Sequence, residues 1–128
     1  MAGEIQLNTI LQVANPTTAT GFVCSEAAKQ QSITQSAVGQ HSDVYTVPTT
    51  AAGVALSIGN IGTLGISYFQ NLDATNFIEV GTNSANTFFP CLRLNAGEAF
   101  PFRFAQGIAP FARANTASCK LYYRILEN

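Results

Sequence analysis

The fold is decided most clearly by residues 119–126, which read Cys-Lys-Leu-Tyr-Tyr-Arg-Ile-Leu. Every second position carries an apolar or aromatic side chain, namely Cys119, Leu121, Tyr123 and Ile125. Successive side chains of a β-strand point to opposite faces, so a period of two is typical of a strand with one buried face. We therefore predict a strand here, with the Cys119 thiol acting as a small buried apolar group.

Shorter segments of the same kind precede this strand, separated by residues that favour turns. The expected strands lie at 44–47, 54–58, 64–70, 77–80, 92–94 and 100–104. Asn and Asp side chains accept hydrogen bonds from their own backbone, so 71–76 and 95–98 are expected turns, and Gly81 should begin a polar loop. Short strands at about ten-residue spacing, with no convincing long helix, predict an all-β fold. We expect an antiparallel β-sandwich of jelly-roll-like form, with a barrel as the alternative.

Aromatic residues supply both the expected core and the expected contact surface. The three phenylalanines of 100–104 share one face and are expected in the core, and Pro101 places their strand at an edge or a bulge because it has no amide N–H. Phe88 and Phe89 are consecutive, so at least one should face away from whatever buries the other. Together with Phe111 they are the candidate interface residues, since an exposed phenylalanine is suited to anchor a partner subunit.

Residues 1–40 differ in composition from the rest of the chain, because they are rich in Thr, Gln, Ser and Ala and have few large side chains. Residues 4–13 alternate loosely between apolar and polar, and 18–24 could return as a partner strand. The segment 25–38 fits two structures equally well. Ser25 could cap a short helix, or the segment could form an extended arm.

The length of 128 residues suits one compact domain over residues 1–128. Within it we expect 1–40 to form a peripheral arm and 41–128 to form the β-sandwich core. Charged residues make up 10% of the chain, against roughly 25% in an average soluble protein. At a formal net charge of −1, copies of the chain repel one another weakly. This favours a subunit of a dense assembly over a small secreted domain with an uncharged polar exterior.

The composition also argues against several partners. The six basic residues are scattered, whereas phosphate binding needs clustered positive charge, so we expect no nucleic-acid partner. Arg93, Arg103 and Arg113 are ten residues apart, which we interpret as similar positions on successive strands. The three cysteines lack metal-site spacing and cannot all pair within one chain, so we expect reduced thiols. No signal peptide and no apolar stretch approaching roughly 18 residues is evident, so we expect cytoplasmic synthesis and no membrane contact.

No catalytic constellation is evident in the sequence. His41, the one histidine, precedes Ser42 and Asp43, but adjacent strand residues point to opposite faces and cannot converge as a triad. We expect His41 in a loop or at the surface. The seven carboxylates are dispersed, and residues 73–79 offer oxygens for calcium without the dense pattern of an EF-hand. We therefore expect no enzymatic activity, no cofactor and no metal site.

Three stretches resemble small β-sandwich virion proteins of tailed bacteriophages. They are 71–81 (Asn-Leu-Asp-Ala-Thr-Asn-Phe-Ile-Glu-Val-Gly), 92–98 (Leu-Arg-Leu-Asn-Ala-Gly-Glu) and the Ala- and Arg-rich run 109–114. The likeness extends over residues 43–126, and its motifs describe turns without attached chemistry. It implies a capsid decoration (cement) protein, or a head or tail component, located in the virion. It also implies contacts with copies of itself, commonly as a trimer, and with a major capsid or other virion protein, and it carries over no catalytic residue.

Two competing functions remain open. A tail- or fibre-associated module could bind a host carbohydrate or receptor by stacking sugars on Tyr45, Tyr68, Tyr122 or Phe111. A small hydrolase would have to be built around His41, and we rank it last.

Overall fold

A computed structural model describes residues 3–14, 23–35 and 37–128. No helix occurs in this part of the chain, so the all-β prediction is confirmed. The chain divides into two compact units, residues 1–36 and 37–128. The assignment of the whole chain to one domain stays a prediction.

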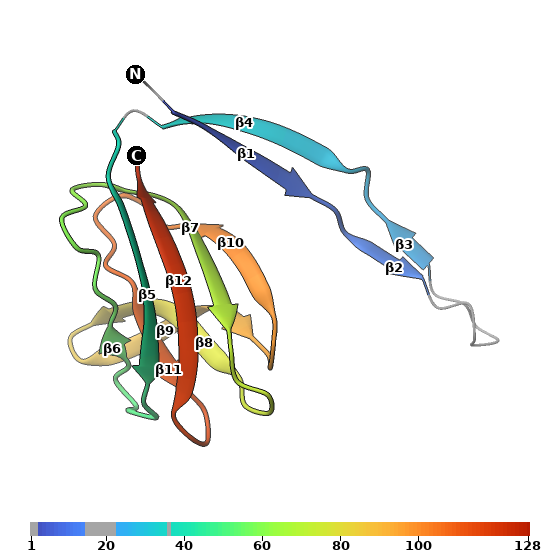
Figure 1. The fold of residues 1–128 in the computed structure, drawn as a ribbon. Helices are drawn as coiled ribbons and strands as arrows, with labels where there is room; N and C mark the ends of the chain where they lie inside the picture. The colour runs from blue at the N-terminus through green and yellow to red at the C-terminus, as the bar shows by residue number, and fades with distance from the viewer. Residues whose placement is uncertain (1–2, 15–22, 36) are drawn as a thin grey trace. The chain divides into compact units, whose positions relative to one another are not determined.

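Residues 37–128 form two four-stranded antiparallel sheets (Figure 1). Sheet 1 contains, in spatial order, β10 (Ala99–Arg103), β7 (Leu64–Asn71), β12 (Cys119–Glu127) and β5 (Gln40–Val47). Sheet 2 contains, in spatial order, β6 (Val54–Ala55), β11 (Phe111–Ala114), β8 (Ile78–Ser84) and β9 (Thr87–Leu94). Side chains from both sheets share one hydrophobic core, as an antiparallel β-sandwich requires. The jelly-roll form stays a prediction.

The core is centred on β12, which lies between β7 and β5 in sheet 1. Its four alternating side chains (Cys119, Leu121, Tyr123 and Ile125) are fully buried, as predicted. The fully or almost fully buried side chains that sheet 2 contributes to this core are Ile78, Val80, Leu94, Ala112 and Ala114. Because β12 has a neighbouring strand on each side and sheet 2 over one face, its alternation is the cleanest in the chain. Each large apolar side chain buried in this way contributes about 1.5–3 kcal/mol.

The turn between β7 and β8 is held by two side chains, which confirms the turn predicted from Asn and Asp. Asn71 is fully buried, and its Nδ2 donates to the carbonyl oxygens of Asn76, Leu94 and Asn95 at 2.8, 3.1 and 3.1 Å. Asp73 Oδ1 accepts from two backbone N–H groups of the same turn, at 2.6 and 2.8 Å. These bonds, the one from Asn76 foremost, hold the pKa of Asp73 below its ordinary value of 3.8.

Gly81 does not begin a loop, so that prediction is wrong. Strand β8 continues to Ser84, and its pairing with β9 shifts register at Gly81 in a β-bulge. A Cβ at this position would lie 2.0 Å from the carbonyl oxygen of Phe89, so the close approach of the strands requires glycine. The chain turns instead at Ala85 and Asn86, whose φ angles of 49° and 65° suit a two-residue hairpin.

Strand β10 forms an edge of sheet 1, as the missing N–H of Pro101 predicted. Its aromatic face is only partly in the core. Phe104 is buried and Phe102 half-buried, whereas Phe100 is exposed, so the core prediction is wrong for Phe100. Phe100 is exposed because β10 is the last strand of sheet 1, so its side chains have a neighbouring strand on one side only.

A second edge strand also carries a proline. Strand β9 ends sheet 2 and contains the exposed Pro90, as β10 contains Pro101 in sheet 1. A proline cannot donate a ladder hydrogen bond, so both strands are poor templates for another strand.

Residues 1–36 contain antiparallel strand pairs that we call the arm ribbon. Its strands are β1 (Gly3–Thr9), β2 (Gln12–Ala14), β3 (Val23–Ser25) and β4 (Lys29–Gln35). Strand β1 pairs with β4, and β2 pairs with β3. The extended alternative for 25–38 is therefore confirmed in its described part, and the helix alternative is wrong. Most of the partner strand expected at 18–24 lies outside the described residues.

Candidate interaction surfaces

His41 lies in β5 with its side chain half-buried, so the expectation of a loop position is wrong. Its ring lies 6.0 Å from the ring of Tyr123, and its Nε2 is buried without a hydrogen-bond partner among the described residues. Ser42 is exposed and lies on the opposite face of the strand. Asp43 Oδ1 accepts from the backbone N–H of Val44. The three side chains do not converge as a triad.

The carboxylates near the calcium pattern are already engaged. Asp73 accepts hydrogen bonds from its own turn, and Glu79 Oε2 accepts from Nε and Nη2 of Arg113 at 3.2 and 2.5 Å. Within the described ranges, no group of three His, Cys, Asp or Glu side chains is placed to hold a metal ion. Cys91 and Cys119 are free thiols, and burial raises the pKa of the Cys119 thiol.

The three candidate interface phenylalanines lie in different environments. Phe89 is 49% exposed and Phe88 only 7%, so one of the pair faces outward, as predicted. The ring of Phe88 packs where Gly53 leaves space, and the Arg113 guanidinium carbon lies 4.8 Å from its centre. Phe88 is thus used inside the subunit. Phe111 is half-buried on β11, and the interface role of all three stays a prediction.

The arm ribbon presents an apolar face that the ribbon itself cannot bury. Ile5 lies opposite Ile33 in the β1–β4 register, and Leu7 lies on the same face. These side chains are half-buried, whereas Ile10 and Leu11, in the connection to β2, are 66% and 57% exposed. We call Ile5, Leu7 and Ile33 the arm face.

The outward face of sheet 1 carries a second group, the tyrosine face, made of Val44, Tyr68, Tyr122 and Arg124. The register places Val44 beside Tyr122, and Tyr68 beside Arg124. The two tyrosine rings lie edge to face with centres 6.1 Å apart, and Arg124 Nε donates to Tyr122 Oη at 3.3 Å. Tyrosine and arginine are among the residue types enriched at protein interfaces.

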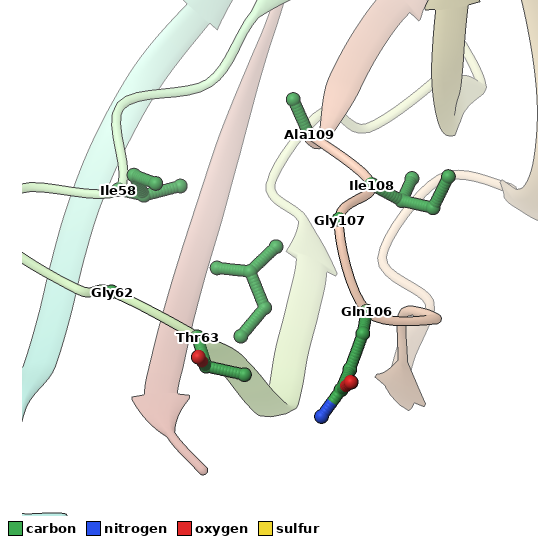
Figure 2. A pocket seen from close by; sticks show the side chains of 8 residues that line it. Ile58, Gly62, Thr63, Gln106, Gly107, Ile108 and Ala109 are labelled. Carbon is green, nitrogen blue, oxygen red and sulfur yellow. The ribbon is translucent and has the colours of Figure 1, made fainter.

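One pocket, of about 420 Å³, opens between residues 58–64 and 106–109 (Figure 2). We call it the end pocket. Ile58, Ile108 and Ala109 supply apolar walls, while Thr63 and Gln106 add uncharged polar groups. No titratable side chain lines it, so it offers shape and weak polarity without catalytic chemistry.

A second pocket, of about 350 Å³, lies where three connecting segments meet the outward face of sheet 2. We call it the loop pocket, and it is lined by Thr49, Ala51, Phe77, Glu79, Arg113, Ala114 and Asn115. It combines an aromatic ring, an ion pair, a hydroxyl and an amide. Among the pockets described here it alone contains charged groups.

Comparison with protein-family models, curated proteins and solved structures finds no match. The surfaces must therefore be interpreted from their own chemistry. In addition, none of the described segments forms a helix of the length and hydropathy that a membrane crossing requires.

Sequence reasoning missed the loop pocket, although one signal pointed toward it. The ten-residue spacing placed arginines on successive strands, and Arg93 and Arg113 do flank Glu79 in one row across sheet 2. Arg103 instead lies on β10 of sheet 1. The spacing could not show that Thr49 and Asn115, 66 positions apart, reach the same pocket.

Proposed function

We propose that this chain is a structural protein of a bacteriophage virion, a capsid decoration (cement) protein that stabilises the shell through contacts between subunits. In this proposal the protein is not an enzyme. It forms a homo-oligomer, with a trimer favoured, and binds a major capsid or other virion protein after synthesis in the host cytoplasm. The observation that supports the proposal most is the arm face, whose apolar side chains are only half-buried.

A two-stranded ribbon is marginally stable at best by itself. The arm face places Ile5, Leu7 and Ile33 together, yet none of these side chains is fully buried. Burial of each such side chain contributes about 1.5–3 kcal/mol. The ribbon therefore gains stability when another surface covers this face, and neighbouring subunits in a shell provide such surfaces.

The charge distribution also supports a subunit of an assembly. Thirteen of 128 residues are Lys, Arg, Asp or Glu, with a formal net charge of −1. Long-range repulsion between copies is therefore weak. At the tyrosine face, Tyr68, Tyr122 and Arg124 offer the residue types from which interface hot spots are built.

The second candidate function is carbohydrate or receptor recognition on a tail or fibre. The loop pocket favours it, because Phe77, Glu79 and Arg113 place an aromatic ring beside polar groups of both hydrogen-bonding kinds. The rings expected from sequence (Tyr45, Tyr68, Tyr122 and Phe111) do not line this pocket.

Heating of particles tests the decoration function. Particles that carry the protein are expected to release their DNA at a higher temperature than particles that lack it, because subunit contacts must break first. Adding purified protein back should restore the higher temperature. Equal rupture temperatures with and without the protein would contradict the proposal.

A further inference from the structure

The loop pocket lies at a convergence of segments from three parts of the chain. Thr49 and Ala51 follow β5, Phe77 precedes β8, and Asn115 follows β11. Binding groups are disproportionately found on loops that a rigid sheet positions. The volume of about 350 Å³ falls within the range of small-ligand pockets.

Arg113 is held in place before any ligand arrives. Its Nε and Nη2 donate to Glu79 Oε2, and its Nη1 donates to the carbonyl oxygen of Ala51 at 3.2 Å. The Phe88 ring lies beneath the guanidinium. A side chain fixed by this many contacts loses little conformational freedom on binding, so the pocket is preorganised.

The pocket retains hydrogen-bonding groups that nothing in the described structure uses. Toward other described residues, Arg113 engages three of its five N–H groups and Glu79 Oε1 accepts no hydrogen bond. The Thr49 hydroxyl has no partner in the described residues, and Asn115 uses only its Nδ2, toward Thr116. Donors and acceptors therefore stand side by side around one opening.

These groups match a neutral polyol. A sugar hydroxyl can donate to a carboxylate and accept from a guanidinium at the same time. The Arg93 guanidinium carbon lies 3.4 Å from the centre of the Phe77 ring and covers one face of it, so the C–H groups of a sugar would pack against the rest of that ring and against Ala51 and Ala114.

Among the residues that line the pocket, the opposite charges of Glu79 and Arg113 are paired, and the neighbouring Arg93 is already stacked on Phe77 outside the lining, so the lining itself carries no net charge that would select an anion or a cation. We propose that the loop pocket binds a neutral saccharide of hexose type. This inference stands apart from the decoration function and locates the second candidate function.

The test is a titration of the full-length protein by amide NMR with methyl glucoside, methyl galactoside and methyl mannoside, each at millimolar concentration. At least one hexoside is expected to shift the amide signals of Glu79, Ala114 and Asn115 saturably. Thr49→Val and Asn115→Ala should each weaken that binding about threefold to tenfold, because each removes one hydrogen bond. Both side chains lie at the surface, so these variants should fold.

The matched control is Thr50→Val, an exposed neighbour that does not line the pocket. It should bind the hexoside as the wild type does. The proposal is overturned if no hexoside shifts these signals, if only sodium sulfate does, or if Thr49→Val and Thr50→Val have the same effect. A loss of hexoside binding should leave the rupture temperature of particles unchanged, so this result and the decoration test are independent.

Discussion

Tyr123 shows how one side chain serves both the core and a loop. Its ring is fully buried and lies 6.3 Å from the ring of Phe69, while its hydroxyl donates to the carbonyl oxygen of Ser57 at 2.9 Å. Burial raises the pKa of Tyr123 to about 12, with Asp43 as a lesser cause. The hydroxyl therefore attaches the segment after β6 to the centre of sheet 1 only while it is protonated.

Replacement of this hydroxyl should be measurable both at neutral and at alkaline pH. Tyr123→Phe is expected to lower the free energy of unfolding by about 1 kcal/mol at pH 7, because the Ser57 carbonyl loses its donor. In the wild type, an unfolded tyrosine ionises near pH 10 and the folded Tyr123 only near 12. The contribution is complete below pH 10 and is lost as pH rises through 12, because the folded state resists ionisation of the buried hydroxyl whereas the unfolded state does not.

Urea unfolding at several pH values checks this prediction. The stability of the wild type should fall more steeply between pH 10 and 12 than that of Tyr123→Phe. Tyr122→Phe is the control, since Tyr122 faces outward and its neighbour Arg124 is exposed. Parallel pH curves for wild type and Tyr123→Phe would show that the hydroxyl is not buried as described.

At the scale of strands and turns, the elements that could be predicted are those whose own residues carry a clear local pattern. Strand β12 was predictable because a central strand shows its burial directly as alternation, and the turn at 71–76 because Asn71 and Asp73 form their own local hydrogen bonds. The bulge at Gly81 was not predictable, because it depends on how β9 approaches β8. Glycine alone does not distinguish a loop from a close approach of backbones.

Gly81→Ala tests the bulge. The new methyl group would collide with the backbone of Phe89 and Pro90, neither of which can move away as a flexible side chain would. We expect a loss of about 2 kcal/mol in the free energy of unfolding, as for other overpacked sites. Thr82→Ala, one residue along the same strand, serves as the control and should cost less. Urea unfolding measures the free energy of unfolding of both variants, and the dependence of that free energy on urea concentration should stay unchanged. Equal losses of stability in Gly81→Ala and Thr82→Ala would contradict the steric explanation.

At the scale of the whole molecule, the proposed role of the arm face in self-association is tested by placing a charge in it. Ile33→Lys places a charge in that face, whereas Thr34→Lys places the same charge on the exposed side of β4. Light scattering should give an oligomeric mass for the wild type and for Thr34→Lys. Ile33→Lys should have a lower mass, because an unpaired charge is costly to bury. A monomeric wild type across a range of concentrations would refute the role of the arm face.

The candidate sites were less predictable than the fold, for a geometric reason. A strand can be recognised from the alternation within about eight residues. The loop pocket instead joins Thr49, Phe77 and Asn115, which are distant in the sequence and come together only in the folded β-sandwich. The sequence could predict that one of Phe88 and Phe89 is exposed, but not which of the two. The use of Phe88 beneath Arg113 could not be predicted, because that contact joins β9 to β11 across the intervening β8.

The prolines of the two edge strands β9 and β10 affect how the protein behaves at high local concentration. Pro90 and Pro101 interrupt the donors along β9 and β10, so recruitment of a further strand at these borders would leave hydrogen-bond acceptors unmatched. Growth into cross-β fibrils begins with such recruitment. In the proposed decoration function, copies crowded together on a shell would therefore not seed aggregates at these borders.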